Sequence, residues 1–427
     1  MEEYPLFTVI IPQKNRAEYL IHTLKTCMIQ EYPNFEVIVS DDCSDDNSVE
    51  VAQECAKKDP RIKVFPHEKH LGMRDNFEFA LNQVRQGYVI ALGGDDGLVA
   101  GGIQRMYELI KETGRDVLTW NTAYFMYPNE EGGKPKFLLK RDRDRGVKII
   151  RSEDFLNKVA DTLQYQKDDC PMFYMKGVVA TYLIERVKSR TPDGCFYYCP
   201  TPDGFSGIAI VGEVEDYAYT KEPLTIAGTS KKSISFAYKS NDKEQRHDAD
   251  EFFKDSTRKT MHEQLASQPY CPLTSVMTAD YLLTARDLPG WPGKFEMFTM
   301  EKLLRVTFAS LVKATYPNEA LVREMHILKA IAEQHNLLPL FDELMKTTKR
   351  KYVRTEYFDG FVITPRSLMF DGSELGINNI YDAALATKYF YNFTQSLKFK
   401  EILGIIKRSF KTIMNSRNYK VEKLPQI

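Results

Sequence analysis

The first 120 residues alternate between two spacings of hydrophobic side chains. Short apolar runs rich in β-forming residues occur at residues 6–11, 35–39, 62–65, 88–92 and 117–120. The segments between them have apolar residues three or four positions apart, at residues 17–30, 47–57, 76–85 and 102–112. This alternation of strand and helix predicts an α/β fold with a doubly wound, mainly parallel sheet. Such sheets bind ligands outside the carboxyl ends of their strands.

The remainder of the chain changes character twice. Residues 124–152 are polar and loop-like, and helical spacing dominates from about residue 248 onward. We therefore expect an α/β unit at residues 1–240, with halves at about 1–122 and 123–240. A mainly helical, helix-rich C-terminal module is expected at residues 241–427. A chain of 427 residues is long enough for two such units.

Charge and composition narrow the possible functions. The chain has 58 Lys and Arg against 59 Asp and Glu, so it lacks the overall positive charge typical of nucleic-acid binding. No apolar stretch approaches the roughly 20 residues that span a bilayer, and the first residues do not resemble a secretory signal. We therefore expect a cytoplasmic protein. The seven scattered cysteines form no paired zinc motif and are interpreted as reduced thiols.

Acidic residues follow the predicted strand at residues 35–39. The run at residues 41–46 reads DDCSDD. Carboxylates at the carboxyl end of a strand can accept hydrogen bonds from a nucleobase or a ribose. Asp and Ser also cap helices, so this run alone leaves both interpretations open.

A second acidic motif follows the predicted strand at residues 88–92. It reads Gly93-Gly94-Asp95-Asp96-Gly97. Glycines let the backbone approach a ligand closely, and adjacent carboxylates are hard oxygen ligands for Mg²⁺ or Mn²⁺. An Asp-Gly turn explains Gly97 but gives no reason for two acids after two glycines. Two acidic strand ends in one sheet therefore predict a site for a nucleotide diphosphate and a metal ion.

Three motifs together resemble the family 2 glycosyltransferases of the GT-A fold. They are Thr8-Val-Ile-Ile-Pro12, Val39-Ser-Asp-Asp-Cys-Ser-Asp45 and Gly94-Asp-Asp96. The resemblance covers the first 120 residues strongly and continues weakly to about residue 236. It implies an inverting, metal-dependent transfer of a sugar from a nucleotide sugar, for which we expect a UDP-sugar. The expected acceptor is a hydroxyl group of a glycan, including a lipid-linked glycan, and the expected cofactor is Mn²⁺ or Mg²⁺.

The resemblance also implies roles for individual residues. Asp42 is expected to contact the base and Asp96 to bind the metal, with Asp95 at the ribose or beside the metal. The backbone from Pro12 to Lys14 is expected beside the nucleoside. Lys14 departs from the aromatic or small residue often found there, so Lys14 or Arg16 is a candidate for binding the diphosphate instead.

Further basic residues are candidates on the same grounds. Arg74, near the start of a predicted helix that opens with Gly72 to Asn76, is a second diphosphate candidate. Lys231, between Ser230 and Lys232, lies in a stretch that resembles the loop closing the catalytic domain in these enzymes. It can hold donor phosphate or an acidic acceptor, although a solvated loop explains the same residues.

An inverting transfer requires a carboxylate that takes the proton of the acceptor hydroxyl. The tetrad Thr-Pro-Asp-Gly at residues 201–204 precedes an apolar helical run, so Asp203 is expected at a helix N-terminus, where the family has its base. The same tetrad occurs at residues 191–194, which makes Asp193 the rival candidate. The residues after Asp193 indicate a strand, and a turn role suffices for it.

The C-terminal residues 397–420 place apolar side chains on one stripe and basic side chains elsewhere. This pattern is typical of a basic amphipathic helix. Such a helix can lie on an anionic membrane, which would make the protein peripheral on the inner face of the membrane. It can equally contact a partner chain, in a homo-oligomer for example, or pack on its own domain.

Other classes of protein share the predicted fold. A non-catalytic binding or scaffold protein would not need the acidic motifs to be intact. A sugar nucleotidyltransferase would need a glycine-rich basic loop after the first strand, and Pro12-Gln-Lys-Asn-Arg16 has no glycine. A dinucleotide-dependent dehydrogenase would need GxGxxG at the same place. His67 and His70 have metal-ligand spacing, but their setting indicates a loop.

Overall fold

The computed structural model describes most of the chain. The described residues are 4–128, 133–140, 146–233, 258–312, 318–353, 361–363, 367–396 and 419–423. The predicted boundary near residue 240 and nearly all of the predicted basic helix at residues 397–420 lie outside them. The domain division and the membrane, oligomer and acceptor contacts of the C-terminal region therefore stay predictions.

An eight-stranded sheet dominates the described part of the chain, in the order β3-β2-β1-β4-β10-β6-β11-β9. The four strands β3, β2, β1 and β4 are parallel, and β11 is parallel to β6. Strand β10 runs antiparallel between β4 and β6, and β9 runs antiparallel to β11. The predicted α/β fold with a mainly parallel sheet is confirmed. The strands are β1 (Phe7–Gln13), β2 (Phe35–Asp41), β3 (Ile62–Pro66), β4 (Tyr88–Ala91), β6 (Val117–Trp120), β9 (Val147–Arg151), β10 (Gly177–Ala180) and β11 (Asp216–Thr220).

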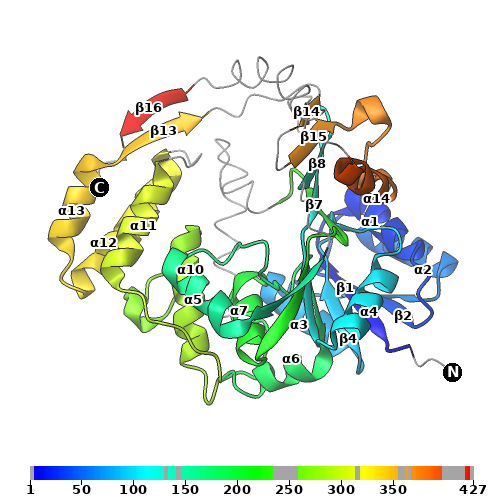
Figure 1. Ribbon diagram of the computed structural model, residues 1–427, viewed down its shortest axis with the longest axis horizontal. Helices are drawn as coiled ribbons and strands as arrows, with labels where there is room; N and C mark the ends of the chain where they lie inside the picture. Colours follow the sequence, from blue (N-terminus) through cyan, green and yellow to red (C-terminus); the bar gives the residue numbers. More distant parts are fainter. Residues whose placement is uncertain are drawn as a thin grey trace.

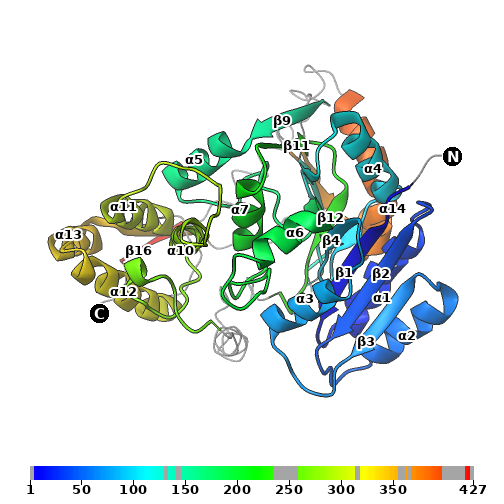
Figure 2. The same ribbon diagram turned by 90° about the horizontal axis from the view of Figure 1, so that it is seen from below.

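Both faces of this sheet are covered, because successive side chains of a strand point to opposite faces. Phe7, Val9 and Ile11 of β1 belong to the core that includes α1, α2 and α4, whereas Ile10 belongs to the core on the other face. Figures 1 and 2 show helices on both sides of the sheet. These helices are α1 (Ala17–Met28), α2 (Ser48–Lys58), α3 (Met73–Asn82), α4 (Gly102–Thr113), α5 (Ser152–Thr162), α6 (Thr181–Lys188) and α7 (Gly204–Gly212).

A second sheet joins segments that are far apart in the sequence, in the order β14-β15-β8-β7-β12-β5. Strand β15 pairs antiparallel with β8, with Phe370 opposite Phe137. Helix α14 (Ile380–Ser396) packs on this sheet and on α1, so residues near 380 share a core with residues near 125 and 226 (Figure 1). The strands are β5 (Gly97–Leu98), β7 (Ala123–Met126), β8 (Lys136–Lys140), β12 (Thr225–Thr229), β14 (Phe361–Ile363) and β15 (Ser367–Asp371).

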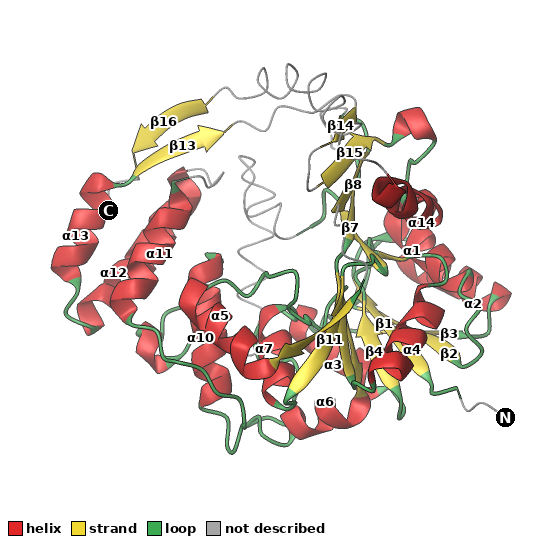
Figure 3. Cartoon of the chain, in the orientation of Figure 1, coloured by secondary structure: helices red, strands yellow, loops and turns green. Residues whose placement is uncertain are grey.

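A group of helices extends the core on the α7 side of the main sheet. Helix α10 packs against α7 and α5, and α11 to α13 pack against one another beyond it (Figure 3). A two-stranded antiparallel pair, β13 with β16, follows this group. The elements are α10 (Thr274–Arg286), α11 (Met300–Leu311), α12 (Asn318–Gln334), α13 (Leu338–Thr347), β13 (Lys349–Val353) and β16 (Tyr419–Lys423).

No helix in the described segments is both long enough and apolar enough to cross a membrane.

The contact between α7 and the segment after α10 generates a stability prediction. A Cβ added at Gly212 would lie 2.1 Å from a ring atom of Trp291, whose Nε1 donates to the Ala209 carbonyl at 3.0 Å. Gly212→Ala is expected to lower the free energy of unfolding by about 1–3 kcal/mol, because the methyl group overlaps the ring in a close-packed interior. Urea unfolding followed by circular dichroism measures this change.

The matched control for this prediction is the same substitution in a Trp291→Ala background. Removing the ring removes the overlap, so Gly212→Ala is expected to cost much less there. An equal cost in both backgrounds would show that the overlap with Trp291 is not the cause.

Candidate functional site

The predicted site residues gather where β1, β2 and β4 end. In the parallel pairing of β1 with β2, Pro12 lies opposite Ser40 and Gln13 opposite Asp41. The carboxyl end of β4 leads directly into residues 92–96 beside them. The segments at residues 12–16, 41–46 and 93–96 therefore share one edge of the sheet, as the sequence predicts.

Asp42 is buried, with 3% of its surface exposed, and its carboxylate holds the turn before α3. The backbone N–H groups of Leu71 and Gly72 donate to it at 2.6 and 3.1 Å, and His70 Nδ1 lies 2.8 Å away. The backbone N–H of Ser48, which begins α2, donates instead to Asp46. Of the two interpretations of the acidic run, helix capping thus accounts for Asp46 but not for Asp42.

Asp96 joins the two sheets through its carboxylate. Its Oδ2 accepts a hydrogen bond from the Gly93 N–H at 2.8 Å, and its Oδ1 accepts one from the Gly228 N–H of β12 at 2.9 Å. Only 1% of the residue is exposed. Burial and the neighbouring charge of Asp95 raise the pKa of Asp96 to about 7, against the smaller opposite effect of the two amides.

Asp95 lies at the centre of a polar cluster with Arg16, Ser230 and Ser233. Its Oδ2 accepts hydrogen bonds from Arg16 Nη1 at 3.0 Å, Ser230 Oγ at 2.6 Å and Ser233 Oγ at 3.3 Å. Arg16 also donates to Ser230 Oγ and to the Lys232 carbonyl. The structure thus brings Arg16, the acidic motif and the loop after β12 together, although they lie up to 217 residues apart in the sequence.

Two other predicted residues, Arg74 and Asp193, pair with each other. The guanidinium of Arg74 is buried and forms an ion pair with Asp193. It also donates to the Tyr197 carbonyl at 2.6 Å and to Asp75 at 3.0 Å. Arg74 therefore links α3 to the segment at residues 193–197. Its diphosphate role stays a prediction.

The remaining predicted basic residues lie at the surface of this edge. Lys14 Nζ is 3.2 Å from His70 Nδ1, and Lys232 Nζ donates to the Asn15 carbonyl. Lys231 is exposed. The loop after β12 thus contacts the β1–α1 loop through Lys232, which bonds to Asn15 and Arg16.

Asp203 stands at the N-terminus of α7, as predicted. Its side chain makes no capping hydrogen bond to the helix, and its Oδ2 accepts a bond from the Tyr165 hydroxyl at 3.2 Å. Burial raises the pKa of Asp203 above its ordinary value, although hydrogen bonds from Thr201 and Tyr165 act in the opposite direction. A carboxylate that does not cap its helix and has a raised pKa has the properties of a general base.

The sequence analysis missed Tyr174, whose buried hydroxyl lies beside the acidic motif. A Cβ added at Gly93 would lie 2.8 Å from the Tyr174 hydroxyl. Burial raises the pKa of Tyr174 well above its ordinary value, and the charges of Asp96, Asp95 and Asp203 raise it further. Tyr174 therefore lies within electrostatic reach of both acidic groups. It follows a loop without periodicity, and no pattern in the sequence singles it out.

Asp95 and Asp96 fit a Mg²⁺ or Mn²⁺ ion that is shared with a diphosphate. Their adjacent buried charges, visible in the raised pKa of Asp96, favour a second cation beside Arg16. In the part of the chain that the structure describes, no three His, Cys, Asp or Glu side chains gather as a metal site of their own. Mg²⁺ commonly takes one or two protein carboxylates and completes its shell with phosphate and water.

Comparison with known proteins relates the chain to sugar-transferring enzymes. Glycosyltransferase GlyG of Streptococcus pneumoniae serotype 4 is 28% identical over 155 residues, which are 36% of this chain and 50% of that protein. The GalNAc(5)-diNAcBac-PP-undecaprenol beta-1,3-glucosyltransferase of Campylobacter jejuni is 33% identical over 109 residues, 25% of this chain and 35% of that protein. The chain thus spans half or less of the length of these relatives.

Solved structures and a family model add to this comparison. The crystal structure of S. aureus TarS is similar over 84% of this chain and 57% of that chain, with 16% identity and a TM-score of 0.43. The model of glycosyl transferase family 2 matches residues 8–176, which include both acidic motifs and Tyr174. Residues 8–176, which are less than half of the chain, are therefore similar to glycosyl transferase family 2.

Proposed function

We propose that this protein is an inverting glycosyltransferase that transfers a sugar from a nucleotide sugar, with UDP-sugars as the first donors to test, to a hydroxyl acceptor. One observation carries the proposal. Buried carboxylates from two strand ends, Asp42 and the Asp95–Asp96 pair, meet at one sheet edge. A separate carboxylate, Asp203, stands at a helix N-terminus without capping the helix. The first group suits a donor and the second suits a base.

On the donor side, Asp42 fixes the turn at residues 70–72 and thereby the wall beside the nucleoside. The cation of Arg16 lies 3.0 Å from Asp95 and is already desolvated among polar groups. A charged group in such a setting interacts with a diphosphate more strongly than it would in water. Arg16 is therefore our first candidate for orienting the donor diphosphate, ahead of Lys14 and the more distant Arg74.

Asp95 and Asp96 would hold the metal ion, which when bound supplies positive charge to the departing diphosphate. The protein keeps Asp95 in place with the side chains of Arg16 and Ser230, and Asp96 with backbone amides. The N–H groups of Gly93 and Gly228 fix both oxygens of Asp96, so the carboxylate cannot rotate away from the site.

On the acceptor side, Asp203 would take the proton of the attacking hydroxyl. Tyr165 donates to Asp203 Oδ2, and hydrogen bonds of this kind orient the carboxylate. One related protein is named as acting on an undecaprenol-linked glycan. We extend the same acceptor class, a glycan or lipid-linked glycan, to this protein.

Asp96→Ala tests the metal assignment. Nucleotide release from a panel of nucleotide sugars with Mn²⁺ or Mg²⁺, recorded without acceptor, is expected to fall at least about 100-fold, because several kcal/mol of charge stabilisation are lost. A chelator is expected to produce the same loss in the wild type.

The matched control for this measurement is Asp342→Ala, which removes an exposed acid of α13 far along the chain. It should release nucleotide at the wild-type rate, and circular dichroism should show both variants folded. Equal release by folded Asp96→Ala protein would overturn the metal assignment and favour a binding or scaffold protein.

Asp203→Asn tests the base. Transfer to the best glycoside acceptor of a panel is expected to fall about 10²- to 10⁴-fold, whereas donor binding by thermal shift is unchanged. The base acts in its deprotonated form, so the wild-type rate should fall as the pH drops through the raised pKa of Asp203. The variant should lack this acidic limb in its pH–rate profile.

Asp193→Asn is the control, since it changes the same position of the duplicated tetrad. It breaks the ion pair with Arg74, so it is expected to lower the melting temperature while transfer stays within about tenfold of wild type. A larger loss of transfer in Asp193→Asn than in Asp203→Asn would make Asp193 the base.

A further inference from the structure

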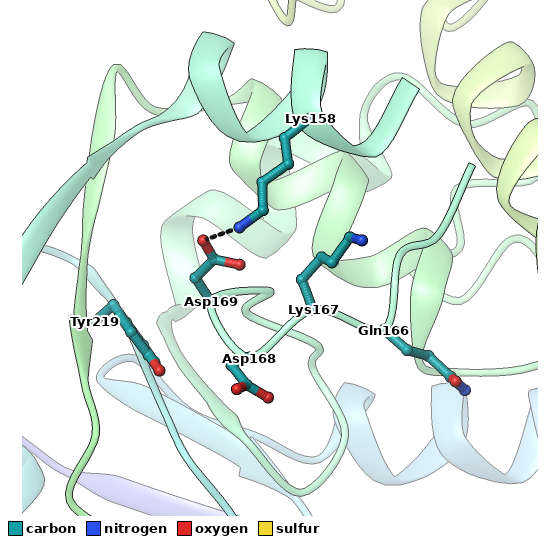
Figure 4. Close-up of a pocket in the computed structure, with 6 residues that line it drawn as sticks. All are labelled: Lys158, Gln166, Lys167, Asp168, Asp169 and Tyr219. Atoms are coloured by element: carbon teal, nitrogen blue, oxygen red, sulfur yellow. Dashed lines mark hydrogen bonds and ion pairs between the residues drawn. The ribbon is translucent and has the colours of Figure 1, made fainter. Parts of the chain in front are cut away.

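A polar cavity of about 430 Å³ lies beyond the proposed donor site (Figure 4). Its lining comes from α5, from the loop between α5 and β10, and from β11. Because β11 is parallel to β6 and Tyr219 is next to its last residue, the cavity lies at the carboxyl edge of the sheet, as the donor site does. Its volume is in the range of small-molecule sites. The lining residues are Lys158, Gln166, Lys167, Asp168, Asp169 and Tyr219.

Two hydrogen bonds connect this cavity with the proposed base. Gln166 Nε2 donates to the Tyr165 hydroxyl at 3.2 Å, and that hydroxyl donates to Asp203 Oδ2 at 3.2 Å. A ligand that contacts Gln166 therefore lies close to the carboxylate that would deprotonate it.

The loop that forms the cavity wall is fixed from within. The buried amine of Lys176 donates to the carbonyls of Lys167 and Asp168 at 2.8 and 2.9 Å. The Tyr217 hydroxyl donates to the Asp169 carbonyl at 2.7 Å, and Lys140 of β8 forms an ion pair with Asp168. A wall held in this way is preorganised, so little ordering is required when a ligand binds.

The side chains of the wall keep hydrogen-bonding capacity for a ligand. Asp169 accepts from Lys158 at 2.7 Å through Oδ2, whereas its Oδ1 is buried without a hydrogen-bond partner. That oxygen is out of a ligand's reach, but Gln166 and Asp168 are exposed. Their amide and carboxylate groups can form hydrogen bonds with the hydroxyl groups of a sugar or polyol.

The charges around the cavity favour an acidic ligand. Asp169 is paired with Lys158, and Asp168 with Lys140, so each carboxylate is already balanced by one lysine. Lys167 has no carboxylate within ion-pair distance among the described residues. Burial and the nearby charge of Lys158 lower the pKa of Lys167, and the charges of Asp169 and Asp161 oppose this shift only in part.

We propose that this cavity is the acceptor subsite and that it takes a sugar or polyol bearing a carboxylate or phosphate, with the acidic group on Lys167 and hydroxyl groups on Asp168 and Gln166. The inference rests on the proposed function, because the acceptor is defined by the transfer that Asp203 would catalyse. It adds the chemical class of the acceptor and the residues that select it.

The test compares three probes that share a sugar ring: D-glucuronate, D-glucose 6-phosphate and D-glucose. Binding to the full-length protein is measured by saturation-transfer NMR and titration. At least one acidic probe is expected to bind about tenfold more tightly than D-glucose, and Lys167→Met should remove this advantage. A preference for only one of the two acidic probes identifies the carboxylate or the phosphate as the recognised group.

Two control variants separate charge from structure. Lys167→Arg keeps the charge and should retain the preference, whereas Lys346→Met, at an exposed position of α13, should not change it. Equal binding of all three probes, no binding of any probe, or an unchanged preference in Lys167→Met would overturn the proposal.

Acceptor-independent nucleotide release distinguishes this inference from the proposed function. Lys167→Met should release nucleotide from the donor at the wild-type rate. Loss of donor release in the wild type would count against the glycosyltransferase proposal, whereas normal release with no acidic preference counts against the acceptor subsite alone.

Discussion

The buried carboxylate of Asp96 is the interaction on which the arrangement of the site depends. One oxygen accepts from Gly93 at the end of the main sheet, and the other accepts from Gly228 in the second sheet. A Cβ on Gly228 would lie 1.7 Å from the Asp95 carbonyl, so only glycine permits this approach of the two sheets. A carboxylate is costly to bury unless its oxygens are bonded, and here two backbone amides offset part of that cost. The remaining cost of burying the charge, together with the nearby charge of Asp95, raises the pKa of Asp96 to about 7.

Fixing Asp96 also fixes its neighbours. Thr23 of α1 donates to the carbonyls of Gly94 and Asp96, so helix α1 fixes the backbone of the motif at residues 93–97. Asp95 is then directed at Arg16 and Ser230, which ties the loop after β12 to the start of α1. The negative charge of Asp95 is therefore balanced by Arg16 and hydrogen-bonded by Ser230, two residues that lie far from Asp95 in the sequence.

The part of the fold that the sequence predicted is the part governed by local periodicity. The apolar run at residues 6–11 became β1, the helical spacing at residues 17–30 became α1, and the acids after both strands lie at one edge because parallel strands end together. Contacts across long sequence separations had no such signal. Gly228 meets Asp96 from 132 residues away, and nothing in the pattern around Arg74 indicated its pairing with Asp193.

The order of the strands places the proposed donor site and the cavity at different positions along the same carboxyl edge of the sheet. The proposed donor residues occupy the ends of β2, β1 and β4, the cavity lies at the end of β11, and the antiparallel β10 separates the two halves. Because β10 runs in the opposite direction, the loop that precedes it lies on the same edge as the site. That loop carries Tyr165 and Gln166, whose hydrogen bonds connect Asp203 with the cavity, and Tyr174, which lies beside the acidic motif. The antiparallel direction of β10 therefore explains how residues 165–174 reach a site that residues 12–96 build.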